Sequence, residues 1–339
     1  MIRLAVLSAW SILRTMAVYP DIKWRPLTAG DADALYRLHA QLEAEQNLPF
    51  RTSREELVHN MAEPKTDLAS DTRVAVAADG SFLASVWIDL SLRQGPKHRA
   101  YVITTALAGH GALELDAIDW AEAQVRERFA VIDDDLPRVI RTFAEANSVD
   151  RIARFESRGY PVVRHFVDMV RPLTEPFPDP VLPVGVELLA WSDRWLSSSF
   201  AAHAEAFGDH WGSLPPSWDE WQHRASWPGC RLDLSYVAVA EGEVVAYCMN
   251  GVYPQDWEVI GRKDGWIDVL GTRRAWRKQG LASALLNASF RSFADEGLDA
   301  ASIGVDAANP TGAFHLYESL GFRAEHRAVS LMKEISPSG

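Results

Sequence analysis

Cysteine is scarce in this sequence, and no metal-ligand pattern accompanies it. Cys230 and Cys248 are the two cysteines among 339 residues, and neither has a CxxC partner or a histidine at metal-ligand spacing. Sparse cysteine usage is typical of the reducing cytoplasm, and isolated cysteines are mostly buried packing residues. We therefore expect a cytoplasmic protein in which no metal is implied.

Long hydrophobic runs and an excess of positive charge are also missing. No run reaches the roughly 18 apolar residues that a membrane span requires, so we expect no membrane partner. The chain carries 34 Lys and Arg against 46 Asp and Glu, a formal net charge of -12. Nucleic-acid binding depends on many basic side chains that replace counterions, so we expect no nucleic-acid partner and favour a cationic small molecule.

The length exceeds what one hydrophobic core usually organises, which predicts two domains of about 150 residues each. Residues 1–15 contain a short apolar stretch that Ser and Trp interrupt, and Arg14 follows without an A-x-A cleavage site. Met16 offers an alternative start. We therefore interpret residues 1–22 as a leader of uncertain structure rather than a signal peptide.

The chain repeats itself at an offset of 162 positions. Four anchor pairs share this offset: Gly80 and Gly242, Asn147 and Asn309, Phe155 and Tyr317, and Gly159 and Gly321. The first pair of glycines lies between apolar stretches, which predicts a β-hairpin in each half. Agreement of four anchors at one offset indicates a tandem duplication.

A proline-rich segment separates the two copies. Residues 173–185 contain four prolines, which exclude both a helix and a central strand. We interpret this segment as a stiff linker between a first domain, residues 23–172, and a second domain, residues 186–336.

The second half alternates predicted strands and helices. This order predicts an α/β domain in which helices cover a mixed sheet. The expected strands are 187–190, 266–272, 301–305 and 328–333 with a hairpin over 237–249, and the expected helices are 193–207, 218–224, 280–296 and 310–320.

The most informative segment is the turn TRRAWRKQGLA at residues 272–282, between a strand and a helix. A basic turn that opens a helix directs backbone N–H groups and the positive helix end at one spot, which forms an anion site. Gly280 lets a ligand approach the backbone, and Ala282 keeps the first helical turn open. The turn matches neither the dinucleotide nor the P-loop fingerprint, so it predicts a pyrophosphate site of another kind. The alternative is an arginine-rich turn that is only solvated surface.

The order of this turn, a helix, a strand, Asn309, Tyr317 and Gly321-Phe322 resembles the GNAT superfamily of acetyl-CoA-dependent N-acetyltransferases. The combination is specific over about the last 100 residues, and the earlier resemblance rests on element order. It implies two tandem GNAT-like domains in this chain, with acetyl-CoA as the acyl donor of the second.

The resemblance also implies a role for each matching residue. Main-chain groups of one strand would pair with pantetheine and polarise the thioester, the turn would bind the pyrophosphate, and Asn309 would contact the pantetheine arm. Tyr317 would protonate the leaving thiolate, although its apolar neighbours are also typical of a core aromatic. The strand residues are Leu270, Gly271 and Thr272, and the turn residues are Arg277, Lys278, Gln279, Gly280, Leu281 and Ala282.

The sequence identifies the general base and the acceptor pocket less clearly than it identifies the acetyl-CoA site. Asp268 is our candidate base, because the family often places a carboxylate a few residues before its basic turn. The other candidate bases are His210, Asp219, Glu220 and His223. Four tryptophans are typical either of a pocket wall or of a core, namely Trp211, Trp218, Trp221 and Trp227.

The first copy departs from the family at the donor site. At the same offset from Arg277, Lys278, Gly280 and Ala282 it has Leu115, Asp116, Ile118 and Trp120. Asp116 and the neighbouring Asp119 would repel a pyrophosphate, and Trp120 would block the approach to the backbone. A shifted frame would use Gly109-His110-Gly111, which is also without Arg or Lys, and Phe155 lacks the hydroxyl of Tyr317. We predict a degenerate domain that serves as a scaffold.

These patterns favour transfer of an acetyl group from acetyl-CoA to a primary amine of a small molecule, by direct attack in a ternary complex. Tandem GNAT chains of this size also resemble mycothiol synthase, which acetylates the amine of a cysteinyl sugar conjugate, and we keep that as a narrower alternative. A non-catalytic CoA-binding regulatory module and a protein lysine acetyltransferase are further alternatives. The sequence leaves the oligomeric state unknown.

Overall fold

The computed structural model describes residues 21–91, 97–174, 176–208, 211, 215–308 and 312–336. Nearly all of the predicted leader, residues 1–22, lies outside this range. The chain divides into two compact units, of which one is Met1–Arg164 with Ala328–Gly339 and the other is His165–Arg327. Within the described ranges, we find no helix with the length and apolar character to cross a bilayer.

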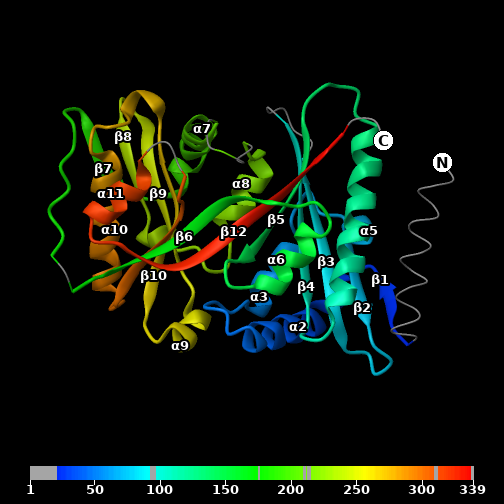
Figure 1. Ribbon diagram of the computed structural model, residues 1–339. Coiled ribbons are helices and arrows are strands. Elements are labelled where there is room, and N and C mark those ends of the chain that lie inside the picture. The colour runs from blue at the N-terminus through cyan, green and yellow to red at the C-terminus, as the bar shows by residue number, and fades with distance from the viewer. Residues whose placement is uncertain are drawn as a thin grey trace. The chain divides into compact units, whose positions relative to one another are not determined.

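The first unit contains a mixed sheet in the order β1-β2-β3-β4-β5-β12. Only β4 and β5 pair in parallel within this order. Helix α5 packs on β3 and β4 through an apolar cluster (Figure 1). The strands are β1 (Lys23–Arg25), β2 (Thr72–Val76), β3 (Phe82–Ser91), β4 (His98–Ala106), β5 (Arg138–Glu145) and the end of β12 (Arg323–Ile335), and the helices are α2 (Ala32–Glu45), α3 (Arg54–Met61), α4 (Leu68–Asp71), α5 (Gly111–Ala130) and α6 (Val149–Glu156).

The second unit contains a sheet in the order β6-β11-β10-β9-β8-β7. Only β10 and β11 pair in parallel within this order, so the predicted α/β fold with a mixed sheet is confirmed. The strands are β6 (Val162–Pro172), β7 (Val186–Ala190), β8 (Tyr236–Ala240), β9 (Glu243–Val252), β10 (Asp264–Thr272) and β11 (Ala300–Asp306), and the helices are α7 (Leu196–Phe207), α8 (Trp218–Ala225), α9 (Trp257–Ile260), α10 (Leu281–Asp295) and α11 (Ala313–Ser319).

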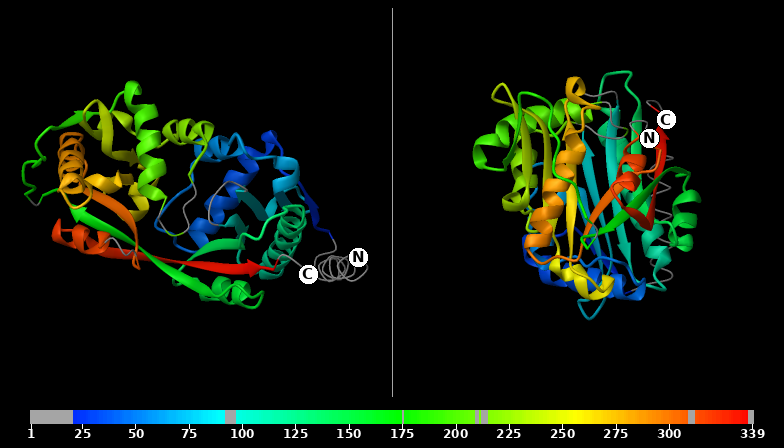
Figure 2. Two further views of the ribbon diagram at one scale, coloured as in Figure 1. Left: turned by 90° about the horizontal axis from the view of Figure 1, so that it is seen from above. Right: turned by 90° about the vertical axis from the view of Figure 1, so that its left-hand side faces the viewer.

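Alternation along β9 divides the core of the second unit into two layers. Successive side chains of a strand point to opposite faces of its sheet. Accordingly, Ala246 and Cys248 pack in the cluster that contains α10, whereas Tyr247 and Met249 pack in the cluster that contains residues of α7. Figure 2 shows the orange α10 and the green α7 on the two sides of the yellow β9.

The last strand of each repeat completes the sheet of the other unit. Strand β6 pairs with β11 from Ala300↔Pro172 to Asp306↔Phe166, and β12 pairs with β5 from Ala328↔Glu145 to Ile335↔Arg138. Apolar residues of each strand accordingly lie in the core of the unit that receives it, as do Met169 and Leu331. The structural division therefore differs from the boundaries expected at residues 172 and 186. Hydrophobic periodicity predicts a strand, but it does not identify the sheet that the strand joins.

The duplicated glycines share one backbone conformation. Gly80 and Gly242 have φ of 87° and 82°, and Gly159 and Gly321 have φ of 81° and 89°. The left-handed region favours glycine, because a Cβ clashes with the backbone there. These pairs therefore have the same local geometry as well as the same sequence offset.

The proline-rich linker is free of helix and strand over its described residues, as its prolines predict. It lies against α10 of the second unit. Asp179 pairs with Arg291 at 2.6 Å, and the Phe177 ring lies 6.2 Å from the Phe290 ring, centroid to centroid.

Position 271 requires glycine because a buried aromatic side chain occupies the space that a Cβ would need. A Cβ on Gly271 would lie 2.6 Å from Cε1 of Tyr247, the residue opposite it on β9. Tyr247 is fully buried, and its Oη lies 2.5 Å from Nδ1 of His203. Burial raises the pKa of Tyr247 and lowers the pKa of His203 to about 3, so this pair is neutral at physiological pH.

We predict that Gly271→Ala destabilises the protein by about 1–3 kcal/mol, because the added methyl displaces the Tyr247 ring from a close-packed core. The thermal unfolding midpoint measures this effect. The control is Gly30→Ala, whose Cβ would lie 3.8 Å from Oγ1 of Thr28, an ordinary contact. Equal midpoints for the two variants would mean that the Tyr247 ring moves without cost.

Candidate functional site

Strand β10 separates from its parallel neighbour halfway along its length. It pairs with β11 from Asp264↔Ala300 to Ile267↔Ile303, whereas its pairing with β9 continues to Thr272↔Ala246. The register with β9 shifts between Ile267 and Val269, which places a β-bulge at Asp268. Past the bulge, no described strand pairs with the edge of β10 that faced β11, and such an edge can pair with an extended ligand.

The predicted anion-binding turn lies at the end of this separated segment. A short 3-10 helix, Arg274–Trp276, follows β10, and α10 begins at Leu281 after the N-cap residue Gly280. Lys278 and Gly280 have φ of 61° and 82°. Alternating left-handed positions curl successive N–H groups toward one side, and positive φ is uncommon for lysine. The turn therefore has the backbone geometry of an anion site at the start of a 15-residue helix.

The side chains of the turn have different functions. The Arg277 guanidinium donates to the carbonyl of Ala206 at 2.9 Å and to that of Thr272 at 3.3 Å, so it braces the turn from within. Gln279 donates to the carbonyl of Ala275 at 2.9 Å. Lys278 is exposed at the apex of the turn. Lys278 thus supplies an exposed positive charge, whereas Arg277 holds the backbone of the turn in place.

Asp268 occupies the bulge, and its carboxylate has a perturbed pKa. Its Oδ2 accepts a hydrogen bond from Oη of Tyr253 at 3.1 Å. The side chain is open to solvent on one side, but protein encloses it elsewhere, and this desolvation raises the pKa of Asp268 to about 7. The Tyr253 hydrogen bond and the nearby Arg224 oppose the shift. A carboxylate with a pKa near neutrality is suited to accept and release a proton.

Two glycines make room for the Tyr253–Asp268 pair. A Cβ on Gly251 would lie 2.4 Å from Oδ2 of Asp268, and a Cβ on Gly229 would lie 2.1 Å from Cε1 of Tyr253. Cys230 lies in the same region, and its pKa is raised to about 12 by burial, with a smaller effect from Asp268. Sequence reasoning missed Tyr253. Gly251, two residues past the predicted hairpin, was the available signal, because a glycine in a strand often marks a close approach.

Tyr317 lies on the α10 side of the sheet, within the apolar cluster that contains Leu281 and Ile303. Its residue exposure is 8%, and its ring lies 5.9 Å from the Phe322 ring, centroid to centroid. Burial raises its pKa, with a smaller effect from nearby Cys248. The phenol therefore stays protonated at neutral pH, as a proton donor requires.

Other predicted site residues have structural roles or lie outside the described residues. Asn309 and His210 lie outside them. Helix α11 begins at Ala313 after the N-cap residue Gly312, not at residue 310 as predicted. Glu220 closes a capping box with Ser217 at the start of α8, while Asp219 is exposed on that helix and His223 is half-buried.

The four tryptophans do not form one group. Trp221 is fully buried in the α7 cluster and donates to the carbonyl of Leu196 at 3.1 Å, so it is a core residue. Trp218 is 37% exposed, and its ring lies 5.5 Å from that of Phe200. Trp211 and Trp227 are half-buried.

In the first unit, the segment that corresponds to the basic turn does not lie at the constant offset of 162 residues. Helix α5 begins at Gly111, so residues 107–110 are the counterpart of the longer turn 273–280. Leu115, Asp116, Ile118 and Trp120 lie inside α5, and assigning them to the turn was wrong. The constant offset fails here because the loops before and after β4 are shorter than those around β10.

The start of α5 is occupied by an internal ion cluster. Glu114 is 1% exposed and accepts hydrogen bonds from Arg151, from Nε of Arg154 at 2.5 Å and from Oγ1 of Thr104 at 2.8 Å. A Cβ on Gly111 would lie 3.2 Å from Nη1 of Arg154. The carboxylate offsets the positive helix end, and the Arg154 side chain covers it.

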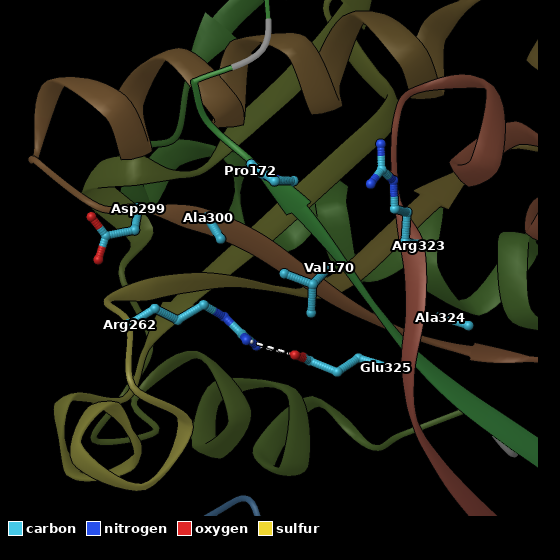
Figure 3. A pocket seen from close by; sticks show the side chains of 8 residues that line it. All are labelled: Val170, Pro172, Arg262, Asp299, Ala300, Arg323, Ala324 and Glu325. Carbon is cyan, nitrogen blue, oxygen red and sulfur yellow. Dashed lines mark hydrogen bonds and ion pairs between the residues drawn. The ribbon is translucent and has the colours of Figure 1, made fainter.

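A cavity of 340 Å³ in the second unit lies away from these residues. It is at the other end of β10, where Arg262 and Glu325 form a bidentate pair at 2.7 and 2.6 Å (Figure 3). The lining residues are Val170, Pro172, Arg262, Asp299, Ala300, Arg323, Ala324 and Glu325. Its distance along the strand from the bulge and the turn separates it from the candidate site.

Comparison with known proteins agrees with this geometry. Residues 197–322 match the Acetyltransferase (GNAT) family. A mycothiol acetyltransferase of Thermobispora bispora is 34% identical over 159 residues, which cover 45% of this chain and 52% of that protein. The matched segment thus spans about half of that relative's length.

Solved structures extend the similarity to both units. A GCN5-related N-acetyltransferase from Sphaerobacter thermophilus has a TM-score of 0.69 at 27% identity, covering 94% of this chain and 96% of that one. A tandem GNAT protein from the clavulanic acid biosynthesis pathway has a TM-score of 0.65 at 17% identity, covers 94% of this chain and 100% of that one, and is similar in fold alone. The second unit therefore contains the segment that matches the GNAT family, residues 197–322, and the similarity to solved structures extends over both units.

Proposed function

We propose that the second unit transfers an acetyl group from acetyl-CoA to a primary amine of a small molecule, by direct attack in a ternary complex. One observation carries this proposal: β10 separates from β11, bulges at Asp268 and ends in a left-handed turn before α10. These features provide an open strand edge, a titratable carboxylate and an anion site along one strand. A non-catalytic CoA-binding module would need the strand edge and the turn, but it would not need a carboxylate with a pKa near 7.

Acetyl-CoA would bind along β10. The main-chain groups of Leu270, Gly271 and Thr272 would pair with the pantetheine arm and polarise the thioester carbonyl. The N–H groups of the turn, residues 277–282, would bind the pyrophosphate, and Lys278 would add a positive charge outside the turn. We also propose that Asn309 contacts the pantetheine arm, and the ground for this role is the sequence motif alone.

The reaction then requires one nucleophile, one base and one proton donor. The amine nitrogen attacks the thioester carbon, an N–C bond forms and the C–S bond breaks. Asp268 accepts the proton that the amine loses, and Tyr317 donates a proton to the departing sulfur. The products are an amide and the CoA thiol, so atoms and charges balance. Asp268 neighbours Cys230 of the α7 side, whereas Tyr317 packs on the α10 side. The two groups therefore approach the reacting carbon from opposite faces of the sheet.

The acceptor class follows from charge and from similarity. A chain with a net charge of -12 favours a cationic amine over an anionic substrate. The similarity to a mycothiol acetyltransferase supports a second, narrower candidate, the amine of a cysteinyl sugar conjugate. Comparing kcat/KM for such a conjugate with kcat/KM for simple primary amines separates the two candidates.

We expect one acetyl-CoA site per chain, because among the described residues the second unit alone combines a basic turn with a helix whose first turn carries no acidic side chain. Calorimetric titration of the full chain measures the stoichiometry. Lys278→Glu should weaken binding about tenfold by placing a negative charge beside the pyrophosphate, while Lys278→Gln should weaken it less. Two sites per chain would mean that the first unit binds CoA, and no binding would leave the proposed reaction without its donor.

Tyr317→Phe should lower kcat by about 100-fold, because the general acid is lost, while the Kd for acetyl-CoA changes by less than about twofold. Steady-state kinetics and calorimetry measure the two effects. The matched control is Tyr236→Phe, which removes a hydroxyl that bonds Ser292 in the same unit and should leave kcat unchanged. Unchanged turnover in Tyr317→Phe would remove this residue from the mechanism.

The pH dependence tests Asp268. Because the base acts in its ionised form and its pKa is about 7, kcat/KM should fall about tenfold per pH unit below pH 7. Asp268→Asn should abolish this acidic limb and leave the titration of the amine acceptor. Tyr253→Phe removes a hydrogen bond that lowers the pKa of Asp268, so it should move the limb to higher pH. A limb with its midpoint near pH 7 that persists in Asp268→Asn would belong to another group of the protein.

A further inference from the structure

Trp266 lies on the same face of the second unit's sheet as Asp268. Its two neighbours on β10 point to the other face, because a Cβ on Gly265 would lie 2.8 Å from the Phe293 ring of α10 and Ile267 packs in the α10 cluster. Successive side chains of a strand alternate, so Trp266 points away from α10. The indole is half-buried and, among the described residues, is a member of neither apolar cluster of this unit.

A carboxylate and a phenol lie beside this tryptophan. Trp266 is directly opposite Gly251 on β9. A Cβ on Gly251 would lie 2.4 Å from Oδ2 of Asp268 and 2.8 Å from Oη of Tyr253. Cβ atoms of directly opposite residues are about 4.5–5.5 Å apart, so both oxygens lie within about 8 Å of the Trp266 Cβ. The indole, the carboxylate and the hydroxyl therefore share one small region of the sheet.

The backbone of the neighbouring strand is accessible on this face. Ser302 on β11 is directly opposite Trp266, and Gly304 follows two residues later. Both share the face of Trp266, because Ala301 and Ile303 pack in the α10 cluster. Gly304 is exposed, although β11 has a paired strand on each side. A ligand beside the indole can therefore approach the sheet closely at Gly304.

A purely structural role for Trp266 is the alternative. Ser302 donates to Oδ2 of Asp264 at 2.6 Å, and both residues are 1% exposed. Trp266 neighbours them on the same face, so its indole can cover this hydrogen bond. Covering requires a large apolar side chain, whereas attraction of a cation requires an aromatic ring. Leucine at position 266 retains the first property and removes the second.

We propose that Trp266 and Asp268 bind the acceptor as an alkylammonium ion, with the indole face and the carboxylate on different sides of the cation. A cation is attracted to the face of an indole more strongly than to other aromatic side chains, and a carboxylate adds Coulomb attraction. Tyr253 holds the carboxylate through its hydrogen bond of 3.1 Å. The role of this site in the reaction rests on the proposed function, because Asp268 would take its proton from the same ammonium group.

Recognition of the cation itself has a consequence for ligands that cannot react. A quaternary ammonium ion has neither a proton to lose nor a lone pair for attack on a thioester. It nevertheless carries the charge that the indole and the carboxylate attract. Quaternary ammonium compounds should therefore bind at this site and compete with amine acceptors.

The test is calorimetric titration of the full chain with choline at pH 8, where Asp268 is largely ionised. The neutral probe of the same shape is 3,3-dimethylbutan-1-ol. Choline should bind at least about fivefold more tightly than this alcohol. Trp266→Leu should weaken choline binding about fivefold or more and leave the affinity for the alcohol within about twofold, because only the attraction between the cation and the ring is lost.

A matched control assigns the response to this tryptophan. Trp24→Leu removes a half-buried tryptophan of the first unit and should bind choline like the unchanged chain. If Trp266→Leu does not fold, Trp266→Phe should still weaken choline binding about twofold or more, since phenylalanine attracts cations less than tryptophan does. Equal affinities for choline and the alcohol, or choline binding that neither variant weakens, would overturn the proposal.

Kinetics with a primary amine separates this site from the proposed reaction. Acetylation with the same KM in Trp266→Leu and in the unchanged chain would overturn the ammonium site and leave acetyl transfer intact. Choline binding that depends on Trp266, in a chain that acetylates no amine, would support the ammonium site and contradict the proposed function.

Discussion

The separation of β10 from β11 after Ile267 is the constraint on which the candidate site depends. Had the parallel pairing continued to Thr272, the strand edge would be consumed by β11 and closed to any ligand. On its other edge, β10 still pairs with β9 to its end, and the bulge at Asp268 takes up the change in register between the two strands. The displaced carboxylate then needs space, which Gly251 and Gly229 provide for Asp268 and Tyr253. An open edge, a raised pKa and two glycines are thus consequences of one irregularity in a ladder.

The first unit has the same separation without the same chemistry. Its β4 pairs with β5 only as far as Tyr101↔Arg141, although β4 continues to Ala106. The divergence of the two parallel strands is therefore a property of the duplicated fold. What differs is the segment that follows: residues 107–110 are too few to form the left-handed basic turn that precedes α10. Loop length and charge, rather than sheet geometry, distinguish the two copies.

Local patterns were predictable from the sequence, and long-range partners were not. The hairpins, the order of strands and helices, and the turn before α10 follow from periodicity and glycine positions over short windows, and the structure agrees within a few residues. The exchange of β6 and β12 leaves no local trace, because a strand has the same alternation in either sheet. The Tyr253–Asp268 and His203–Tyr247 contacts join residues 15 and 44 positions apart, and only packing brings them together. The constant offset of 162 failed at α5 for a related reason, since loop insertions change the alignment without changing the elements.

Electrostatics at the two equivalent helix starts supports the proposal that the first unit has no acetyl-CoA site. The first turn of α10 contains no acidic residue, so its N–H groups remain available to an anion. The first turn of α5 contains Glu114, whose charge offsets the helix end and holds Arg151 and Arg154. Adding a hydroxyl at Phe155 would supply the equivalent of Tyr317 without opening this helix start. Removing Glu114 would leave two partly buried guanidinium groups without their carboxylate, a change that typically costs several kcal/mol. The ion cluster at the start of α5 thus also stabilises the first unit, so under the proposal of a single acetyl-CoA site the missing anion site is tied to the stability of this unit.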